Sequence, residues 1–150
     1  MRRAGAIGCA TVLTGRLLQP QILAALARAG HGSRILVADG NYPHWTTRGP
    51  NAEVTFLNLN PGVVSATNVV AALLAAVRVE SVAVMAPPAG DPEPPIWEEF
   101  RTLLGLDEPL EEIERFAFYE AAASPDVTLT VASADERLYA NLLLTIGVAA

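Results

Sequence analysis

The sequence predicts an α/β fold of three layers, in which helices cover a mainly parallel sheet of about six strands. Two short apolar runs, residues 34–39 (RILVAD) and 81–86 (SVAVMA), read as strands buried on both faces. Segments with helical periodicity separate such runs along the chain. Alternation of strands and helices is typical of layered folds built around a parallel sheet.

Each expected element has its own local signal. A helix is predicted over residues 18–30, because Pro20 suits its first turn and Gly30 suits the position after its end. A second helix is predicted over residues 66–79, with Ser65 or Thr67 as its cap. The remaining elements are a strand at 53–59, a helix at 96–105 closed by Gly105, an alternating and therefore extended start to 114–122, a strand at 127–133 and an extended segment at 139–148. Residues 40–51 and 87–95 are rich in turn formers and predict loops.

The chain is expected to form a single domain over residues 1–150, with residues 1–13 as an N-terminal extension. The apolar run in the opening stretch MRRAGAIGCATVL is too short, and too interrupted by glycine, for the core of a normal signal peptide. No stretch is long and apolar enough to predict a membrane span. The proline-rich residues 87–95 are the best candidate for a break, but either half alone is small.

Composition excludes several classes of function. The net charge is −6 and no basic run is present, so a nucleic-acid partner is not expected. All ten basic residues are arginine, which excludes Schiff-base lysines, lysine-bound pyridoxal phosphate and a Walker A loop. Cys9 is the only cysteine, so neither an internal disulfide nor a thiolate zinc cluster is expected. A reducing cytoplasm is the simplest setting.

Two polar residues flank the strand at 34–39. His31 follows the predicted C-terminus of the first helix, where backbone carbonyls favour a protonated imidazole, and it suits proton transfer near neutral pH. Asp39 ends the strand, at the sheet edge where ligands of α/β proteins bind. The structural alternatives are a helix-capping histidine and an aspartate that caps the ADGN turn.

Further candidates lie near the C-terminus and in one loop. Tyr139 and Asn141 share a face if their segment is extended, and Arg115 would share a face with Tyr119 in an extended RFAFYE. Phenol, amide and guanidinium groups suit a polyol ligand, although each also has a structural reading. His44 could be a second acid–base residue, and Trp45 could stack on the face of a sugar. The favoured readings are structural: His44 is a loop residue and Trp45 covers the core.

Together these segments resemble the D-ribose pyranase / L-fucose mutarotase (RbsD/FucU) family. The matching segments, in chain order, are AGHGS (29–33), LVAD (36–39), GNYP (40–43), ERFAFYE (114–120) and ADERLYANLLLTIGV (134–148). The resemblance covers roughly residues 15–150, and Arg115 places the chain closer to the fucose mutarotase branch. Ser33 departs from the acidic residue that the family often has after GHG.

The resemblance implies interconversion of the anomers of a free monosaccharide, L-fucose or a related pyranose, with no cofactor and no metal. It implies that His31 donates and accepts the proton and that Tyr139 relays one. The residues implied to hold the sugar hydroxyls are Asp39, Arg115, Tyr139, Ala140 and Asn141. It also implies a ring-like homo-oligomer, such as a decamer, with pockets near subunit contacts.

Two other readings remain open from the sequence. One is a non-catalytic monosaccharide-binding or sugar-transport accessory protein on the same fold, which needs the hydroxyl-binding residues but no working acid–base group. The other is a small enzyme of another class on a doubly wound sheet. Fold alone does not decide between them.

Overall fold

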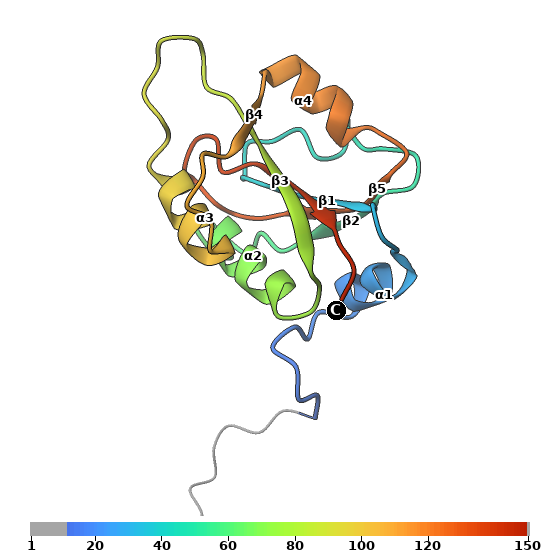
Figure 1. Cartoon of the computed structure of the whole chain (residues 1–150). Coiled ribbons are helices and arrows are strands. Elements are labelled where there is room, and N and C mark those ends of the chain that lie inside the picture. The colour runs from blue at the N-terminus through green and yellow to red at the C-terminus, as the bar shows by residue number, and fades with distance from the viewer. Residues whose placement is uncertain (1–11, 150) are drawn as a thin grey trace, which may run out of the picture.

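The computed structural model describes residues 12–149, which hold four helices and six strands (Figure 1). The helices are α1 (Pro20–Arg28), α2 (Ala66–Leu74), α3 (Ile96–Leu104) and α4 (Arg115–Ala122). The strands are β1 (Arg34–Ala38), β2 (Glu53–Phe56), β3 (Val79–Met85), β4 (Glu111–Ile113), β5 (Val127–Ala132) and β6 (Leu142–Ile146). Cys9 and nearly all of the expected N-terminal extension, residues 1–13, lie outside the described residues.

All the strands belong to one sheet with the order β2-β5-β1-β6-β3-β4. The pairs β2–β5, β5–β1 and β3–β4 are parallel, whereas β6 pairs antiparallel with both β1 and β3. The expected α/β fold with a mainly parallel sheet is therefore confirmed, with one reversed strand in the middle. Because β6 runs the opposite way, its first residues lie at the same edge as the last residues of β1 and β3.

Helices cover both faces of the sheet, as Figure 1 shows, with α4 on the side opposite α1, α2 and α3. The larger core lies under α1, α2 and α3 and includes Ile22, Leu73 and Phe100 with the sheet residues Ile35 and Leu129. The smaller core lies under α4. Its members include Leu36, Ala38, Tyr42, Phe118 and Leu143. The alternation of Ile35 and Leu36 between the two cores is the period of a strand that is buried on both faces.

The helix ends match most of their sequence signals. Ser65 caps α2 in a capping box with Asn68, and Pro20 occupies the first turn of α1. Gly105 closes α3 in the left-handed conformation, at φ 65°. After α1, however, the left-handed residue is Gly32 and not Gly30, because Ala29 leaves the helix in an extended conformation. No helix within residues 12–149 is both long and apolar enough to cross a bilayer.

The extended start predicted for residues 114–122 is wrong, because these residues form α4. The alternation of Phe116 and Phe118 suggested a strand, yet Phe116 is 69% exposed and Phe118 is fully buried. The helix begins because the Glu114 carboxylate accepts hydrogen bonds from the backbone N–H groups of Phe116 and Ala117. Phe118 and Ala122, one turn apart, then supply its buried face. The short strand β4 was not predicted.

Candidate active site

A cavity of about 240 Å³ opens at the edge of the sheet where β1 and β3 end and β6 begins. Side chains from four separate segments meet there, at the edge where open α/β sheets bind ligands. The lining residues are Asp39, Asn41, Tyr42, Met85, Arg115, Tyr119, Leu138, Tyr139 and Asn141. The sequence predicted Asp39, Arg115, Tyr139 and Asn141 as ligand-binding residues, and the fold brings these four together.

Asp39 and Asn141 form the buried polar floor of the cavity. Asn141 Nδ2 donates to Asp39 Oδ2 at 3.0 Å, and the backbone N–H of Asp39 donates to Asn141 Oδ1 at 2.9 Å. The backbone N–H of Asn41 donates to the other carboxylate oxygen of Asp39 at 2.9 Å, so Asp39 also caps the turn, which the sequence left open as its structural alternative. Burial raises the pKa of the Asp39 carboxyl, and the hydrogen bonds from Asn41 and Asn141 partly oppose this rise.

Arg115 and Tyr119 form one wall from adjacent turns of α4. Arg115 Nε donates to Tyr119 Oη at 3.2 Å, and this bond raises the pKa of the guanidinium. The two side chains share a face because residues four apart in a helix are neighbours. Arg115 is the first residue of α4, where a cation is unfavourable for helix stability. An arginine that the helix disfavours and that lines a cavity is a good candidate for binding ligand oxygens.

Tyr139 lies in the turn before β6 and not in an extended segment, so the predicted conformation of residues 139–141 is wrong. Its φ is +63°, the left-handed region, which costs a non-glycine residue roughly 1–2 kcal/mol. Trp97 Nε1 of α3 donates to the carbonyl oxygen of Tyr139 at 3.2 Å. Tyr139 nevertheless lines the same cavity as Asn141, because the turn places both at the start of β6.

Several of the lining residues were not predicted from the sequence. Asn41 and Tyr42 follow Asp39 in the GNYP turn, and Met85 ends β3 at the same sheet edge as Asp39. The rule that strand ends gather at one edge would have found Met85. The Tyr42 and Tyr119 rings meet edge-on at 5.5 Å between centroids. Burial raises the pKa of the Tyr42 phenol to about 12, so the hydroxyl stays protonated at neutral pH.

Two other predicted site residues do not line the cavity. His31 precedes β1, whereas Asp39 follows it, so the two residues lie at opposite ends of that strand. The His31 side chain is 59% exposed, and its Nε2 lies 2.9 Å from Glu80 Oε2. Ala140 is fully buried and packs in the larger core. Its predicted contact with a ligand stays a prediction.

His44 and Trp45 do not line the cavity either. The His44 ring packs against Tyr42 and Phe56, at centroid distances of 5.4 and 6.2 Å. Burial lowers the pKa of the His44 imidazole, against an opposite effect of the Ala38 and Asp39 backbone. Trp45 is 66% exposed and lies under the Arg48 guanidinium. Among residues 12–149, no group of three or more His, Cys, Asp or Glu side chains is placed to hold a metal ion.

The fold and the cavity define a class of protein. It is a three-layer α/β protein with a small polar pocket, rich in hydroxyl-binding groups, at the edge of a sheet whose last strand is reversed. Residues 13–149 match the RbsD / FucU transport protein family, and the chain belongs to this family.

Known relatives agree in sequence and in structure. The human fucose mutarotase is 39% identical over 145 residues, which cover 89% of this chain and 91% of the human protein. The structure of FucU from Bifidobacterium longum has a TM-score of 0.76 and 29% identity, and the match covers 88% of this chain and 95% of that one. The fucose mutarotase of Streptococcus pneumoniae, solved in complex with L-fucose, has a TM-score of 0.75 and 26% identity, and the match covers 88% and 94% of the two chains.

Proposed function

We propose that this chain is a sugar mutarotase, an isomerase that interconverts the α and β anomers of a free monosaccharide, L-fucose or a related pyranose. The convergence of Asp39, Arg115, Tyr139 and Asn141 on one small cavity carries the proposal. A volume of about 240 Å³ lies below the roughly 300–1,000 Å³ of pockets for larger ligands, which suits a single monosaccharide. The name of the human relative and the ligand of the streptococcal structure support L-fucose.

The reaction needs two proton transfers and no change of oxidation state overall. A proton is added to the ring oxygen and another is removed from the anomeric hydroxyl, so the bond from C1 to the ring oxygen breaks and an aldehyde forms. The aldehyde rotates about the C1–C2 bond. The former ring oxygen, now a hydroxyl, then attacks the other face and the two protons return. Positioned acid–base groups accelerate such steps by about 10²–10⁴-fold.

The residues of the cavity have different roles in this reaction. The Asp39 carboxylate and the Asn141 amide, fixed against each other, hold sugar hydroxyls on the cavity floor. Arg115 supplies charged donors to the sugar oxygens from the start of α4. The phenol of Tyr139 relays a proton, because it is both a donor and an acceptor.

His31 acts as the proton donor and acceptor, but in the cavity of a second copy of the chain. His31 and Asp39 lie at opposite ends of β1, so one copy does not bring them together. The His31 side chain is 59% exposed and is therefore available to a neighbour. A ring-like homo-oligomer, such as a decamer, would repeat this head-to-tail contact around the ring. We also propose that the protein is located in the cytoplasm.

Saturation-transfer NMR on the anomeric protons of L-fucose, D-ribose and other free pyranoses tests the activity. Wild type is expected to accelerate exchange, most strongly for its preferred sugar, and His31→Ala is expected to lose the acceleration. Sugar binding without acceleration of any sugar would overturn the mutarotase and leave the non-catalytic binding protein.

Mixed assemblies test the shared site. His31→Ala and Asp39→Ala are each expected to be inactive alone, and a co-refolded mixture is expected to regain part of the activity. Activity returns because some cavities then receive a wild-type His31 from one copy and a wild-type Asp39 from another. Mixed oligomers that form in native mass spectrometry but remain inactive would contradict the shared site.

A further inference from the structure

The segment between β5 and β6, residues 133–141, is fixed to the end of β1 by its own polar groups. Ser133 Oγ donates to the carbonyl oxygen of Ala38 at 2.7 Å and accepts the backbone N–H of Asp135 at 3.2 Å. The backbone N–H of Gly40 donates to the carbonyl oxygen of Asp135 at 2.9 Å. This segment therefore begins its turn against the residues on either side of Asp39.

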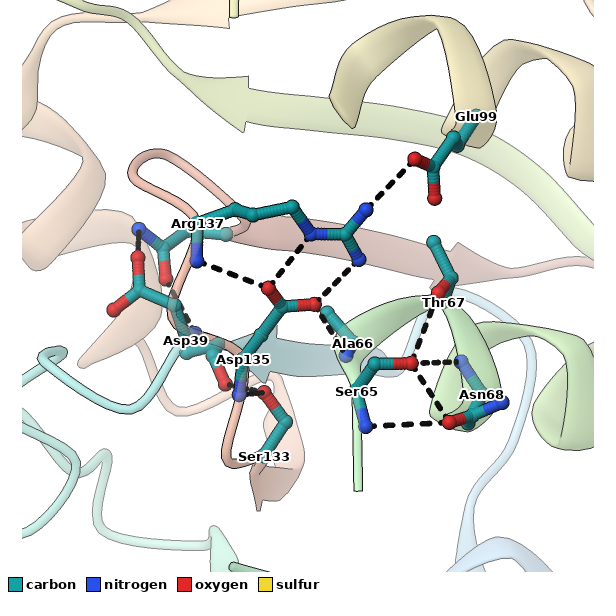
Figure 2. A network of polar contacts seen from close by, with 11 residues as sticks. Asp39, Ser65, Ala66, Thr67, Asn68, Glu99, Ser133, Asp135 and Arg137 are labelled. Carbon is teal, nitrogen blue, oxygen red and sulfur yellow. Dashed lines mark hydrogen bonds and ion pairs between the residues drawn. The ribbon is translucent and has the colours of Figure 1, made fainter. Parts of the chain in front are cut away.

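Asp135 is the centre of the network drawn in Figure 2. Its side chain is 3% exposed, yet its carboxylate accepts four hydrogen bonds. Arg137 donates its backbone N–H and its Nε to Oδ1, at 3.1 and 2.9 Å. Oδ2 accepts Arg137 Nη2 at 2.8 Å and the backbone N–H of Ala66 at 2.9 Å. Burial would raise the pKa of Asp135, but the hydrogen bonds from Arg137 and Ala66 outweigh it and lower the pKa.

The network reaches the helices on one face of the sheet. Ala66 is the first residue of α2, whose N-terminus favours a carboxylate. Arg137 Nη1 donates to Glu99 Oε1 of α3 at 2.7 Å, as Figure 2 shows. Trp97, also on α3, holds the carbonyl oxygen of Tyr139. Two helices thus hold the turn on both sides of Leu138, next to the residue with a φ of +63°.

We propose that Asp135 is a positioning residue, which through Arg137 holds Tyr139 in its left-handed conformation at the wall of the cavity. The inference rests on the proposed function, because Tyr139 is the residue through which Asp135 would act on turnover. Without the carboxylate, the guanidinium of Arg137 loses its buried partner and keeps only the bond to Glu99, so the turn is free to relax toward an ordinary φ. A misplacement of about 1 Å at a reacting group lowers rates by about 10²-fold.

A double-mutant cycle between Asp135→Asn and Tyr139→Phe separates positioning from general stability. Asp135→Asn is expected to lower kcat by about 10²-fold with a smaller change in KM. In the Tyr139→Phe background the further loss is expected to stay within about twofold, while Tm falls equally in both backgrounds. Equal fold losses of kcat in the two backgrounds would show that Asp135 only stabilises the fold and would overturn the inference.

Fluorotyrosine NMR gives a readout that does not depend on turnover. The chain has three tyrosines, at positions 42, 119 and 139, so each resonance is assigned by its own Tyr→Phe variant. Asp135→Asn is expected to shift or broaden the Tyr139 resonance and to leave that of Tyr42 in place. An unchanged Tyr139 resonance would overturn the inference even if activity falls. If wild type accelerates the anomer exchange of no sugar, the proposed function fails. The Tyr139 resonance in Asp135→Asn still tests the positioning in that case.

Asp126→Asn is the matched control. Asp126 lies just before β5, at the sheet edge opposite Asp135, and its carboxylate is 3.6 Å from Arg34 Nε with the side chain 48% exposed. The same chemical change there is expected to leave both the Tyr139 resonance and turnover unchanged. If turnover fell as much in Asp126→Asn as in Asp135→Asn, the loss of any ion pair would be enough to lower turnover. That result would also overturn the inference.

Discussion

Asp39 and Asn141 hydrogen-bond to each other in both directions, although 102 residues separate them in the chain. The amide of Asn141 donates to the carboxylate of Asp39 and accepts the backbone N–H of the same residue. Both residues are buried, and the pair ties the end of β1 to the start of β6. The cavity floor is therefore preorganised before a sugar arrives.

Removal of one member of this pair is expected to destabilise the protein. Asn141→Ala leaves the buried backbone N–H and the Oδ2 atom of Asp39 without their partner, which costs about 1–3 kcal/mol of the free energy of unfolding. Urea denaturation measures the change. Asn58→Ala is the control, because Asn58 is exposed, and it is expected to change stability by less than about 0.5 kcal/mol. Equal stability of the two variants would show that the pair contributes nothing to folding.

The buried carboxyls Asp39 and Asp135 are expected to give opposite dependences of stability on pH. The pKa of Asp39 is raised by burial, so the folded chain binds its proton more tightly than the unfolded chain. Wild type therefore loses stability relative to Asp39→Asn as the pH rises above about 4 through the raised pKa. The pKa of Asp135 is lowered, so wild type loses stability relative to Asp135→Asn as the pH falls below about 4.

Urea titrations of wild type and the two variants, over a pH series that spans this value, give the two difference curves. If the two stability differences changed with pH in the same direction, the pKa of one of the two carboxyls would not be shifted as its burial and hydrogen bonds require. The comparison is internally controlled, because each variant replaces a buried aspartate by the isosteric amide.

The sequence predicted the sheet better than the site. Runs such as RILVAD are buried on both faces and carry a strong local signal, so β1 was found with its ends nearly right. The extended reading of RFAFYE failed because the cap formed by Glu114 outweighs the alternation of its aromatic residues. Arg115 and Tyr119 are neighbours in a helix as they would be on one face of a strand, so their shared face survived the error.

Reversal of β6 and the left-handed turn at Tyr139 had no local signal. A tyrosine at positive φ is uncommon, and it is stabilised here by Trp97, from a distant part of the chain. For His31, the sequence did not show at which edge of the sheet the residue lies relative to Asp39. Its spacing from Asp39 fits a known family, but β1 places the two residues at its opposite ends.

Tyr42 is expected to ionise only at strongly alkaline pH. Burial raises the pKa of its phenol to about 12, so alkaline titration of tyrosinate absorbance should show a step near that pH. Tyr42→Phe is expected to remove this step, whereas Tyr139→Phe keeps it. Because the folded chain holds the proton that the unfolded chain releases, wild type also loses stability relative to Tyr42→Phe as the pH rises above about 10. A step near pH 12 that persists in Tyr42→Phe would contradict the burial of this hydroxyl.

Arg115→Gln is expected to weaken sugar binding without weakening the fold. Loss of a charge-assisted hydrogen bond to a sugar oxygen should raise KM for the preferred sugar by roughly ten- to a hundredfold. Arg115 is exposed and stands at the N-terminus of α4, where removal of a cation favours the helix. Tm should therefore stay the same or rise.

Anomer-exchange NMR at several sugar concentrations gives KM, and calorimetry gives Tm. Arg48→Gln is the matched control, because Arg48 is also exposed but lies over Trp45, outside the cavity. It is expected to leave KM unchanged. An unchanged KM in Arg115→Gln would remove Arg115 from the binding site, and its position at the start of α4 would then need another explanation than sugar recognition.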